Sequence, residues 1–287
     1  MRKLLLQLDT SPHPSVFDRI VAYDAGADEV MSYAGITADA VRDLVHGAIF
    51  TRGQKDLRHT AIFIGGTDMG AGEQLLEAVL DAFFGPMRVS VMLDSNGSNT
   101  TAVAAVAKLI QAAGDVSGRR AVVTAATGPV GLRAAGLLAR AGARVAATSR
   151  RTHNGALAER IQQRFGGTVE EVTMTDGSQA AGALEGAQLL LSAGGAGVRL
   201  VPRDAWVGRG LRAAADLNAV PPVGVEGIEV RDNGVDREGT TTFGALGVGG
   251  LKMKIHKACV ARLFEQNDLV LDVETIAEIG RELTART

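Results

Sequence analysis

Short apolar runs alternate along the chain with longer segments in which apolar residues recur every three or four positions. Runs of the first kind, such as "KLLLQLD" (3–9) and "TAIFIGG" (60–66), are typical of strands buried on both faces. Segments of the second kind, such as "AGEQLLEAVLDAFF" (71–84), indicate helices with one buried face. Strands that alternate with helices predict parallel sheets covered by helices, so we expect an α/β fold.

The alternation falls into two successive parts, which predict two domains. In the first part a further strand, "RVSVMLD" (88–94), is followed by a helix over "NTTAVAAVAKLIQAAG" (99–114), which Gly114 ends. We therefore expect an N-terminal α/β domain over residues 1–114. The C-terminal tail, about 267–287, is a candidate to pack on the same domain.

The second part predicts a Rossmann-type doubly wound parallel sheet over residues 115–266. It begins with an apolar run (121–125), a turn that contains glycine, and a helix (about 129–141). The remaining expected strands and helices lie at 144–148, 155–165, 168–173, 187–194, 212–219 and 250–266.

The turn after residue 125 has the pattern of a dinucleotide-binding site. Its sequence, "ATGPVG" (126–131), matches the fingerprint G-x-G-x-x-G at the second and third glycines, and Ala126 replaces the first. The second glycine lets the backbone approach a pyrophosphate, and the third lets helix and strand pack closely. An ordinary strand–helix turn can carry the same glycines, but the strand and helix on either side favour the binding site. The residues expected to bind the dinucleotide here are Thr127, Gly128, Pro129, Val130 and Gly131.

The end of the following strand indicates which dinucleotide is bound. NAD enzymes usually carry Asp or Glu there, to accept hydrogen bonds from the ribose hydroxyls. This chain has Ser149, Arg150 and Arg151 instead. A guanidinium pairs with the 2′-phosphate of NADP, which an acid would repel. The alternative is that the arginines only solvate the strand end; we predict NADP as the cofactor.

Composition excludes several classes of function. The chain has 30 Lys and Arg against 32 Asp and Glu, a formal net charge of −2, so no general attraction to nucleic acid or an anionic membrane is expected. No stretch approaches the roughly 18–20 apolar residues of a membrane helix, and the apolar run near the N-terminus is too short for a signal peptide. The single cysteine, Cys259, rules out an internal disulfide. A cytoplasmic protein is the simplest interpretation.

Several longer blocks of sequence are more specific than the glycine turn. They are "PSVFD" (14–18), "FTRG" (50–53), "FFGPMRVSVMLDSNGSNTTA" (83–102), "TGPVG" (127–131) and "FGALGVGGLKMKIHKAC" (243–259). Together they resemble the NADP-dependent methylene-tetrahydromethanopterin dehydrogenases of methylotrophic bacteria, some of which also use methylene-tetrahydrofolate. The resemblance covers essentially the whole chain. Two departures are Ala126 in place of a glycine and "TSRRTHN" (148–154) in place of a Gly-Arg-Lys loop, and the second departure keeps a basic pair.

The resemblance implies a two-domain subunit of a homo-oligomer, a trimer, with NADP on the C-terminal domain and the pterin in a cleft between the two domains. The implied reaction oxidises a methylene-tetrahydropterin to the methenyl form and passes a hydride to the nicotinamide. The hydride leaves a carbon between two nitrogens whose lone pairs stabilise the cation, so no general base, metal or covalent nucleophile is required. We expect tetrahydromethanopterin as the carrier, with tetrahydrofolate as a second substrate.

The resemblance also assigns a lysine. Lys252 matches the lysine that the family places near the pterin and the nicotinamide, and its role is expected to be positional or electrostatic. The alternative is a solvated helix lysine, which applies equally to its neighbours Lys254 and Lys257.

A polar segment after the strand at 88–94 is the candidate pterin site. Ligands of α/β proteins usually bind where strands end, and carboxylate and amide groups suit the donor-rich edge of a pterin. The same residue types also form turns and helix caps, and both roles can hold together. Phe17 is expected to pack on the flat pterin rings, unless it is a core residue. The expected substrate-binding residues are Phe17, Asp94, Ser95, Asn96, Ser98 and Asn99.

Two further strand ends are expected to line the nicotinamide side of the site, because small residues there permit close approach. Plain strand-end turns are the alternative. The residues concerned are Ser192, Ala193, Gly194 and Asn218.

Other features and functions carry less weight. His256 and Cys259 lie three residues apart on an expected helix, but two ligands make a poor metal site, so no metal is expected. The rival functions are a reductase of another carbonyl or imine and an NADPH sensor without turnover. A sensor would not need the polar segment 94–101 or the lysine.

Overall fold

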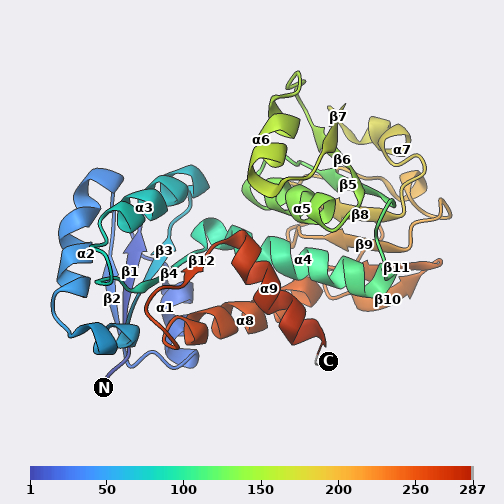
Figure 1. Cartoon of the computed structure of the whole chain (residues 1–287). Coiled ribbons are helices and arrows are strands. Elements are labelled where there is room, and N and C mark those ends of the chain that lie inside the picture. The colour runs from blue at the N-terminus through green and yellow to red at the C-terminus, as the bar shows by residue number, and fades with distance from the viewer. Residues whose placement is uncertain (286–287) are drawn as a thin grey trace. The chain divides into compact units, whose positions relative to one another are not determined.

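The computed structural model describes residues 1–285, which form two compact units (Figure 1). Unit 1 consists of Met1–Thr100 and Met253–Thr287, and unit 2 consists of Thr101–Lys252. Both are α/β structures, so the expected fold class is confirmed. The limits of these two units fall inside helices α4 (Ser98–Ala113) and α8 (Ala245–Arg262), while the domain limits at 114 and 266 stay a prediction from the sequence. A helical pattern does not indicate which part of a long helix packs on which unit.

Unit 1 is built on a five-stranded parallel sheet in the order β12-β4-β3-β1-β2. Chain order reverses between β1 and β3, so the switch point of the sheet lies there. The strands are β1 (Leu4–Asp9), β2 (Glu29–Tyr33), β3 (Thr60–Gly65), β4 (Ser90–Leu93) and β12 (Val270–Leu271).

Helices cover both faces of this sheet. Alternate strand residues, including Leu8 and Ile64, join a core cluster with Val45 and Leu75 from two of the helices. The helices and 3-10 turns of unit 1, besides the ends of α4 and α8 it contains, are α1 (Val16–Asp24), α2 (Val41–Ile49), α3 (Met69–Asp81), α9 (Val273–Ala285), η1 (Ala38–Ala40), η2 (Gln54–His59) and η3 (Ser95–Gly97).

The other face of the sheet carries α1 and the second part of α8. Gln7 of β1 donates from Nε2 to the Ser15 carbonyl at 3.0 Å, at the residue that caps α1. Phe63 of β3 stacks on the His256 ring of α8, with centroids 5.5 Å apart. These alternate positions therefore bring α1 and α8 to the same face of the sheet.

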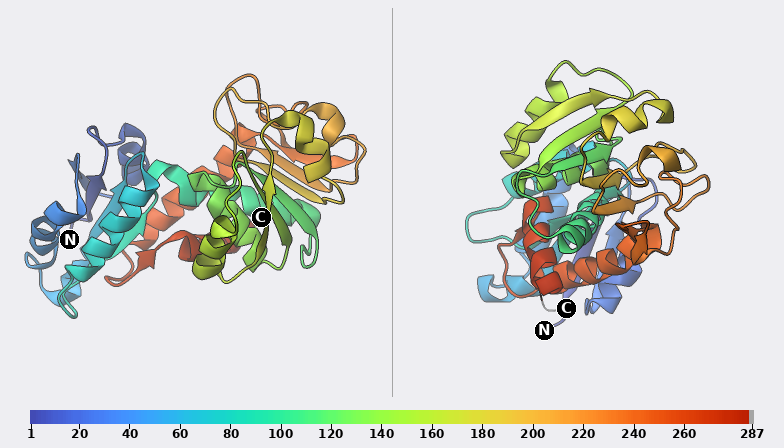
Figure 2. Two further views of the ribbon diagram at one scale, coloured as in Figure 1. Left: turned by 90° about the horizontal axis from the view of Figure 1, so that it is seen from above. Right: turned by 90° about the vertical axis from the view of Figure 1, so that its right-hand side faces the viewer.

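Unit 2 is built on a seven-stranded sheet in the order β10-β11-β9-β8-β5-β6-β7, in which only β10 and β11 pair antiparallel. Figure 2 shows the strands of this unit in two further views, coloured from green to orange. Its parallel part is the Rossmann arrangement, with the switch point between β5 and β8. The strands are β5 (Arg120–Thr124), β6 (Arg144–Ser149), β7 (Val169–Thr173), β8 (Leu189–Ser192), β9 (Ala213–Asp216), β10 (Asn233–Arg237) and β11 (Thr240–Phe243). The helices and 3-10 turns wholly inside it are α5 (Pro129–Arg140), α6 (Ala156–Phe165), α7 (Ala180–Ala183), η4 (Gly177–Gln179) and η5 (Arg203–Ala205).

The expected elements lack α1, α2, α9, β2, β10, β11 and β12. They also differ from the structure at the long helix α8. It begins at Ala245, five residues before the expected start at 250, because the glycines at its beginning do not prevent helical backbone. None of the helices in residues 1–285 has the length and apolar content that crossing a bilayer requires.

Candidate functional site

The glycine turn of unit 2 has the shape that a dinucleotide requires. After β5 the chain passes through Ala125, whose φ of 52° reverses its direction, and reaches α5 with Gly128 as the N-cap. A Cβ on Gly131 would lie 2.5 Å from the Ala125 carbonyl oxygen, so only glycine allows α5 to pack this closely. Pro129 occupies the first helical turn, where no amide donor is lost. The amide groups at the start of α5 therefore form an anion-binding terminus.

A cavity of about 400 Å³ lies beside this turn, at the switch point between β5 and β8. It brings together the glycine turn, the end of β6 and the loop after β8, three segments that are distant in sequence. Predicted cofactor residues that line it are Thr127, Gly128, Pro129, Ser149, Arg150, Ala193 and Gly194. Val130, Gly131, Arg151, Ser192 and Asn218 are not among its lining residues. The cavity and the anion-binding terminus fit a dinucleotide.

The two predicted arginines lie exposed at the end of β6. Arg150 lines the cavity, and the carbonyl of Arg151 accepts a hydrogen bond from the Ser149 hydroxyl. This contact holds the turn whose backbone carries the two arginine side chains. The Ser149 hydroxyl, on a residue predicted to bind the cofactor, thus donates its hydrogen bond within the turn.

A carboxylate on the neighbouring strand β7 supports the same loop. Glu171 accepts hydrogen bonds from Gly155 N at 3.0 Å and Ala158 N at 2.8 Å, which caps α6. Burial acts to raise the pKa of Glu171, but these backbone donors outweigh it and hold the pKa below its usual value. The carboxylate is therefore an internal helix cap.

The strand ends on the other side of the switch point hold a buried acid that the sequence analysis did not single out. Asp216 of β9 pairs in register with Ser192 of β8 and accepts from Asn218 N at 3.2 Å and Val225 N at 3.0 Å. Burial raises the pKa of Asp216 in spite of these bonds. Asn218 donates from Nδ2 to the Pro222 carbonyl at 3.1 Å and so fixes the loop that follows. In the sequence, the feature that could have indicated this buried acid is its position at the end of the apolar run "AAAD" (213–216).

In unit 1 the predicted polar segment begins the helix α4. Asp94, which is 1% exposed, accepts from Asn99 N at 2.9 Å and from Thr100 N at 3.0 Å. Its second oxygen accepts from the Thr100 hydroxyl at 2.6 Å. The structure thus places Asp94 as the cap of this helix.

The rest of the segment is also hydrogen-bonded internally. Ser95 donates to the Gly65 carbonyl at 2.9 Å, Ser98 to the Ser95 carbonyl at 2.8 Å, and Asn99 Nδ2 to the Leu93 carbonyl at 2.6 Å. All three are buried, whereas Asn96 is exposed and has a φ of 56°. Among these residues Asn96 is the one that the structure places at the surface.

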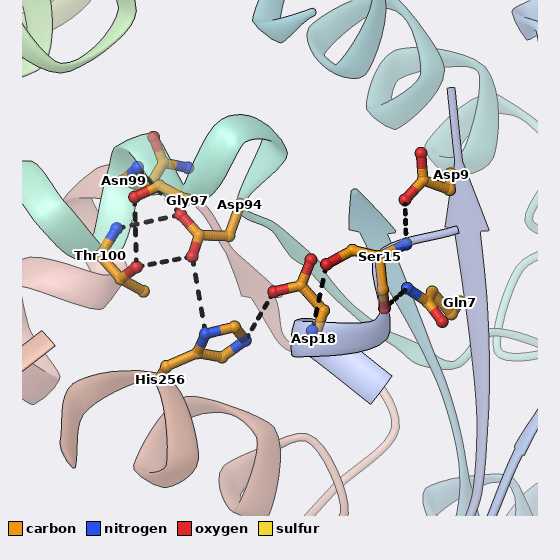
Figure 3. Close-up of polar contacts among 9 residues, drawn as sticks. All are labelled: Gln7, Asp9, Ser15, Asp18, Asp94, Gly97, Asn99, Thr100 and His256. Carbon is orange, nitrogen blue, oxygen red and sulfur yellow. Dashed lines mark hydrogen bonds and ion pairs between the residues drawn. The ribbon is translucent and has the colours of Figure 1, made fainter. Parts of the chain in front are cut away.

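A buried histidine connects the segment to helix α1 (Figure 3). His256 is fully buried, with Nδ1 4.0 Å from Asp94 Oδ2 and Nε2 4.0 Å from Asp18 Oδ1. Phe17, which is 49% exposed, lies with its ring centroid 6.3 Å from that of His256. The sequence suggests for His256 only the role of a metal ligand. No group of three or more His, Cys, Asp or Glu in residues 1–285 is placed to hold a metal ion.

The remaining predicted residue, Lys252, lies in α8 and is partly buried, and its neighbour Lys254 is exposed. Lys257 forms an ion pair with Asp24 at 2.8 Å. Cys259 is fully buried, and burial raises the pKa of its thiol. The three lysines thus have different surroundings within one helix.

A family model and two relatives of known name match the sequence of this chain. Residues 16–96 match the family described as methylene-tetrahydromethanopterin dehydrogenase, N-terminal. The chain is 48% identical over 285 residues to the bifunctional protein MdtA of Methylorubrum extorquens, which covers 98% of this chain and 99% of the relative. It is 33% identical over 298 residues to the NAD(P)-dependent methylenetetrahydromethanopterin dehydrogenase of the same organism, again over 98% of this chain and 99% of the relative.

Solved structures agree on the fold. A shikimate 5-dehydrogenase from Listeria monocytogenes, in complex with shikimate and NAD, superposes with a TM-score of 0.56 at 15% identity, over 97% of this chain and 96% of the other. A quinate dehydrogenase from Corynebacterium glutamicum, in complex with NAD, gives 0.52 at 14% identity, over 98% and 99%. At these identities the similarity concerns the fold alone.

Proposed function

Because the chain belongs to the methylene-tetrahydromethanopterin dehydrogenase family, we propose that it transfers a hydride between a methylene-tetrahydropterin and NADP. The observation that carries the proposal is the cavity beside the glycine turn, which joins an anion-binding helix terminus to Arg150. The carrier is tetrahydromethanopterin, with tetrahydrofolate as a second substrate, and the product is the methenyl form.

In this proposal unit 2 holds the cofactor. The start of α5 receives the pyrophosphate through its amide groups, and Gly128 leaves room for the approach. Arg150 and Arg151 pair with the 2′-phosphate. Ser192, Ala193, Gly194 and Asn218 form the nicotinamide side, where Asp216 and Asn218 keep the loop after β9 in place. When bound, NADP supplies the carbon that accepts the hydride.

Unit 1 receives the pterin, and the protein's contribution is orientation and electrostatics. The nitrogens on either side of the reacting carbon stabilise the cation that forms, so no proton has to be removed. Lys252 positions polar atoms of the substrate and tunes the local charge, while Phe17 offers an apolar ring. The segment from Asp94 to Asn99 shapes the sheet edge beneath the pterin, and Asn96 is its exposed member. We also propose that the protein is cytoplasmic and that it forms a homo-oligomer, a trimer. Light scattering on the purified protein tests the trimer.

The deciding experiment is a steady-state assay with NADP, in which methylene-tetrahydromethanopterin and methylene-tetrahydrofolate are offered in parallel at matched concentrations. Formation of the methenyl product from either supports the proposal, and the ratio of kcat/KM values identifies the preferred carrier. NADPH binding without turnover of either carrier would favour the sensor, and NADPH consumption with another carbonyl or imine would favour the reductase.

A further inference from the structure

The chemistry of a pterin sets a requirement that the protein has to meet. The pyrimidinone ring presents two parallel donors, the ring N3–H and the 2-amino group, on one edge. A carboxylate accepts both with its two oxygens, in the same way that it accepts a guanidinium. A site for this ring therefore needs an accessible carboxylate beside an apolar surface.

Asp94 does not meet this requirement in the structure. It is 1% exposed, and its two oxygens accept three hydrogen bonds from the first residues of α4. A ligand that took these bonds would leave buried N–H groups without their acceptor, which is costly.

Asp18 lies at the same edge of the parallel sheet and is more accessible. Its side chain is 14% exposed and stands in the first turn of α1. The start of α1 is held firmly: Asp9 accepts from Ser15 N at 3.0 Å, Gln7 donates to the Ser15 carbonyl at 3.0 Å, and the Ser15 hydroxyl accepts from Asp18 N at 3.2 Å (Figure 3). The backbone that carries Asp18 is therefore preorganised.

His256 lies beside the Asp18 side chain, with Nε2 4.0 Å from Asp18 Oδ1. The imidazole is fully buried and stacked on Phe63 with an interplanar angle of 16°. Figure 3 shows the ring between the two carboxylates, with Asp94 at Nδ1 and Asp18 at Nε2. The imidazole thus lies 4.0 Å from the cap of α4 on one side and 4.0 Å from Asp18 on the other.

Phe17, the residue before Asp18, supplies the apolar surface. Its ring is 49% exposed and lies 6.3 Å from the His256 ring. An aromatic ring and a carboxylate of adjacent residues, both beside one fixed imidazole, match a flat ring system with donors along one edge.

We propose that Asp18 is the carboxylate that accepts the N3–H and 2-amino hydrogen bonds of the pterin, and that His256 positions it. This assignment rests on the proposed function. It moves the recognition of the donor edge from the predicted Asp94 to a residue that was not singled out in the sequence.

The test compares two ligands on three proteins, and a fourth protein, His256→Gln, tests the positioning role. The ligands are tetrahydrofolate and its analogue with a 2-methyl group in place of the 2-amino group, and the readout is the dissociation constant from calorimetry. The proteins are the unaltered chain, Asp18→Asn, and the control Asp24→Asn, which changes an exposed carboxylate of the same helix. NADP affinity is measured on each protein as a check on folding.

We expect the unaltered protein and Asp24→Asn to prefer tetrahydrofolate about 10- to 100-fold, the value of a charge-assisted pair. Asp18→Asn loses the preference and leaves NADP affinity unchanged. If Asp18→Asn does not fold, Asp18→Ser is used, with the same expected loss. His256→Gln weakens tetrahydrofolate binding but keeps part of the preference.

Two contrary results are distinguishable. A variant at Asp18 that keeps the full preference would overturn the assignment and leave the proposed function standing. If the unaltered protein binds NADP but binds neither tetrahydrofolate nor tetrahydromethanopterin, both the assignment of Asp18 and the proposed function are overturned.

Discussion

The backbone N–H of Ala158 donates a 2.8 Å hydrogen bond to Glu171 Oε1, so a strand residue caps the helix that follows the two arginines. The second oxygen of the same carboxylate holds Gly155 N at 3.0 Å. The loop that begins at Arg150 is therefore fixed at its far end by a neighbouring strand. Order in this loop reduces the entropy lost when an anion binds to it.

Replacing Glu171 with Gln tests this cap through its pH dependence. Because the folded pKa of Glu171 lies below its usual value of 4.5, the ionised cap stabilises the fold above that pH and loses its effect as the pH falls through the folded pKa. We expect Glu171→Gln to lower Tm by about 2–4 °C at pH 7, and the difference from wild type to shrink below pH about 4.5. Thermal unfolding between pH 3 and pH 8 measures this. The exposed Glu185→Gln is the control, and a difference that did not depend on pH would contradict the role.

The double variant Arg150→Ala, Arg151→Ala tests cofactor choice. Removal of both guanidinium groups deprives the 2′-phosphate of its partners and leaves the rest of the nucleotide untouched. We expect KM for NADP to rise at least about 10-fold and KM for NAD to change little. Arg281→Ala, at an exposed arginine of α9, controls for the loss of positive charge. Equal changes for both cofactors would refute the assignment.

The two glycines of the turn are expected to respond differently to alanine. At Gly131 a Cβ would lie 2.5 Å from the Ala125 carbonyl oxygen, so Gly131→Ala destabilises unit 2 by about 1–3 kcal/mol. At Gly128 the nearest contact of a Cβ would be an ordinary 3.4 Å to the same oxygen. Gly128→Ala is therefore expected to keep its Tm and lose NADPH affinity, since its methyl group enters the space of the pyrophosphate. Unchanged affinity in Gly128→Ala would argue against phosphate binding here; Tm and fluorescence titration separate the two effects.

Lys252→Ala tests the lysine that the family resemblance selected. If the ammonium positions the substrate, kcat falls at least about 10-fold, whereas the dissociation constant of NADP stays near that of wild type. Lys254→Ala, two residues further along α8 and exposed, is the matched control. Turnover of Lys252→Ala equal to that of Lys254→Ala would identify Lys252 as a solvated helix residue.

The features predicted best from sequence are those whose cause is local. The turn at Gly128 and Gly131 and the arginines after β6 lie within one strand–helix–strand segment, and short-range chemistry is enough to recognise them. The α/β class follows in the same way from the alternation of apolar runs. Each of these signals can be recognised within a short stretch of the sequence.

The features that were not predicted depend on distant partners. His256 was recognised only as one half of a poor metal site, because nothing near it in sequence announces Asp18 or Asp94 as its neighbours. Asp216 follows three alanines that give no indication of its role. One of its hydrogen-bond donors, Val225 N, lies nine residues further along the chain. The two-residue strand β12 is too short to show a period of its own, so its pairing with β4 could not be seen.

That pairing determines the order in which the protein can be completed on the ribosome. Translation delivers β4 early, but its partner Val270–Leu271 emerges only after all of Thr101–Lys252 has been synthesised. The nascent first sheet therefore waits with an open edge, which invites wrong partners, while unit 2 has its whole sequence in one continuous stretch. When the chain has reached residue 269, every residue of the second unit has been synthesised, whereas the first sheet still lacks its edge strand.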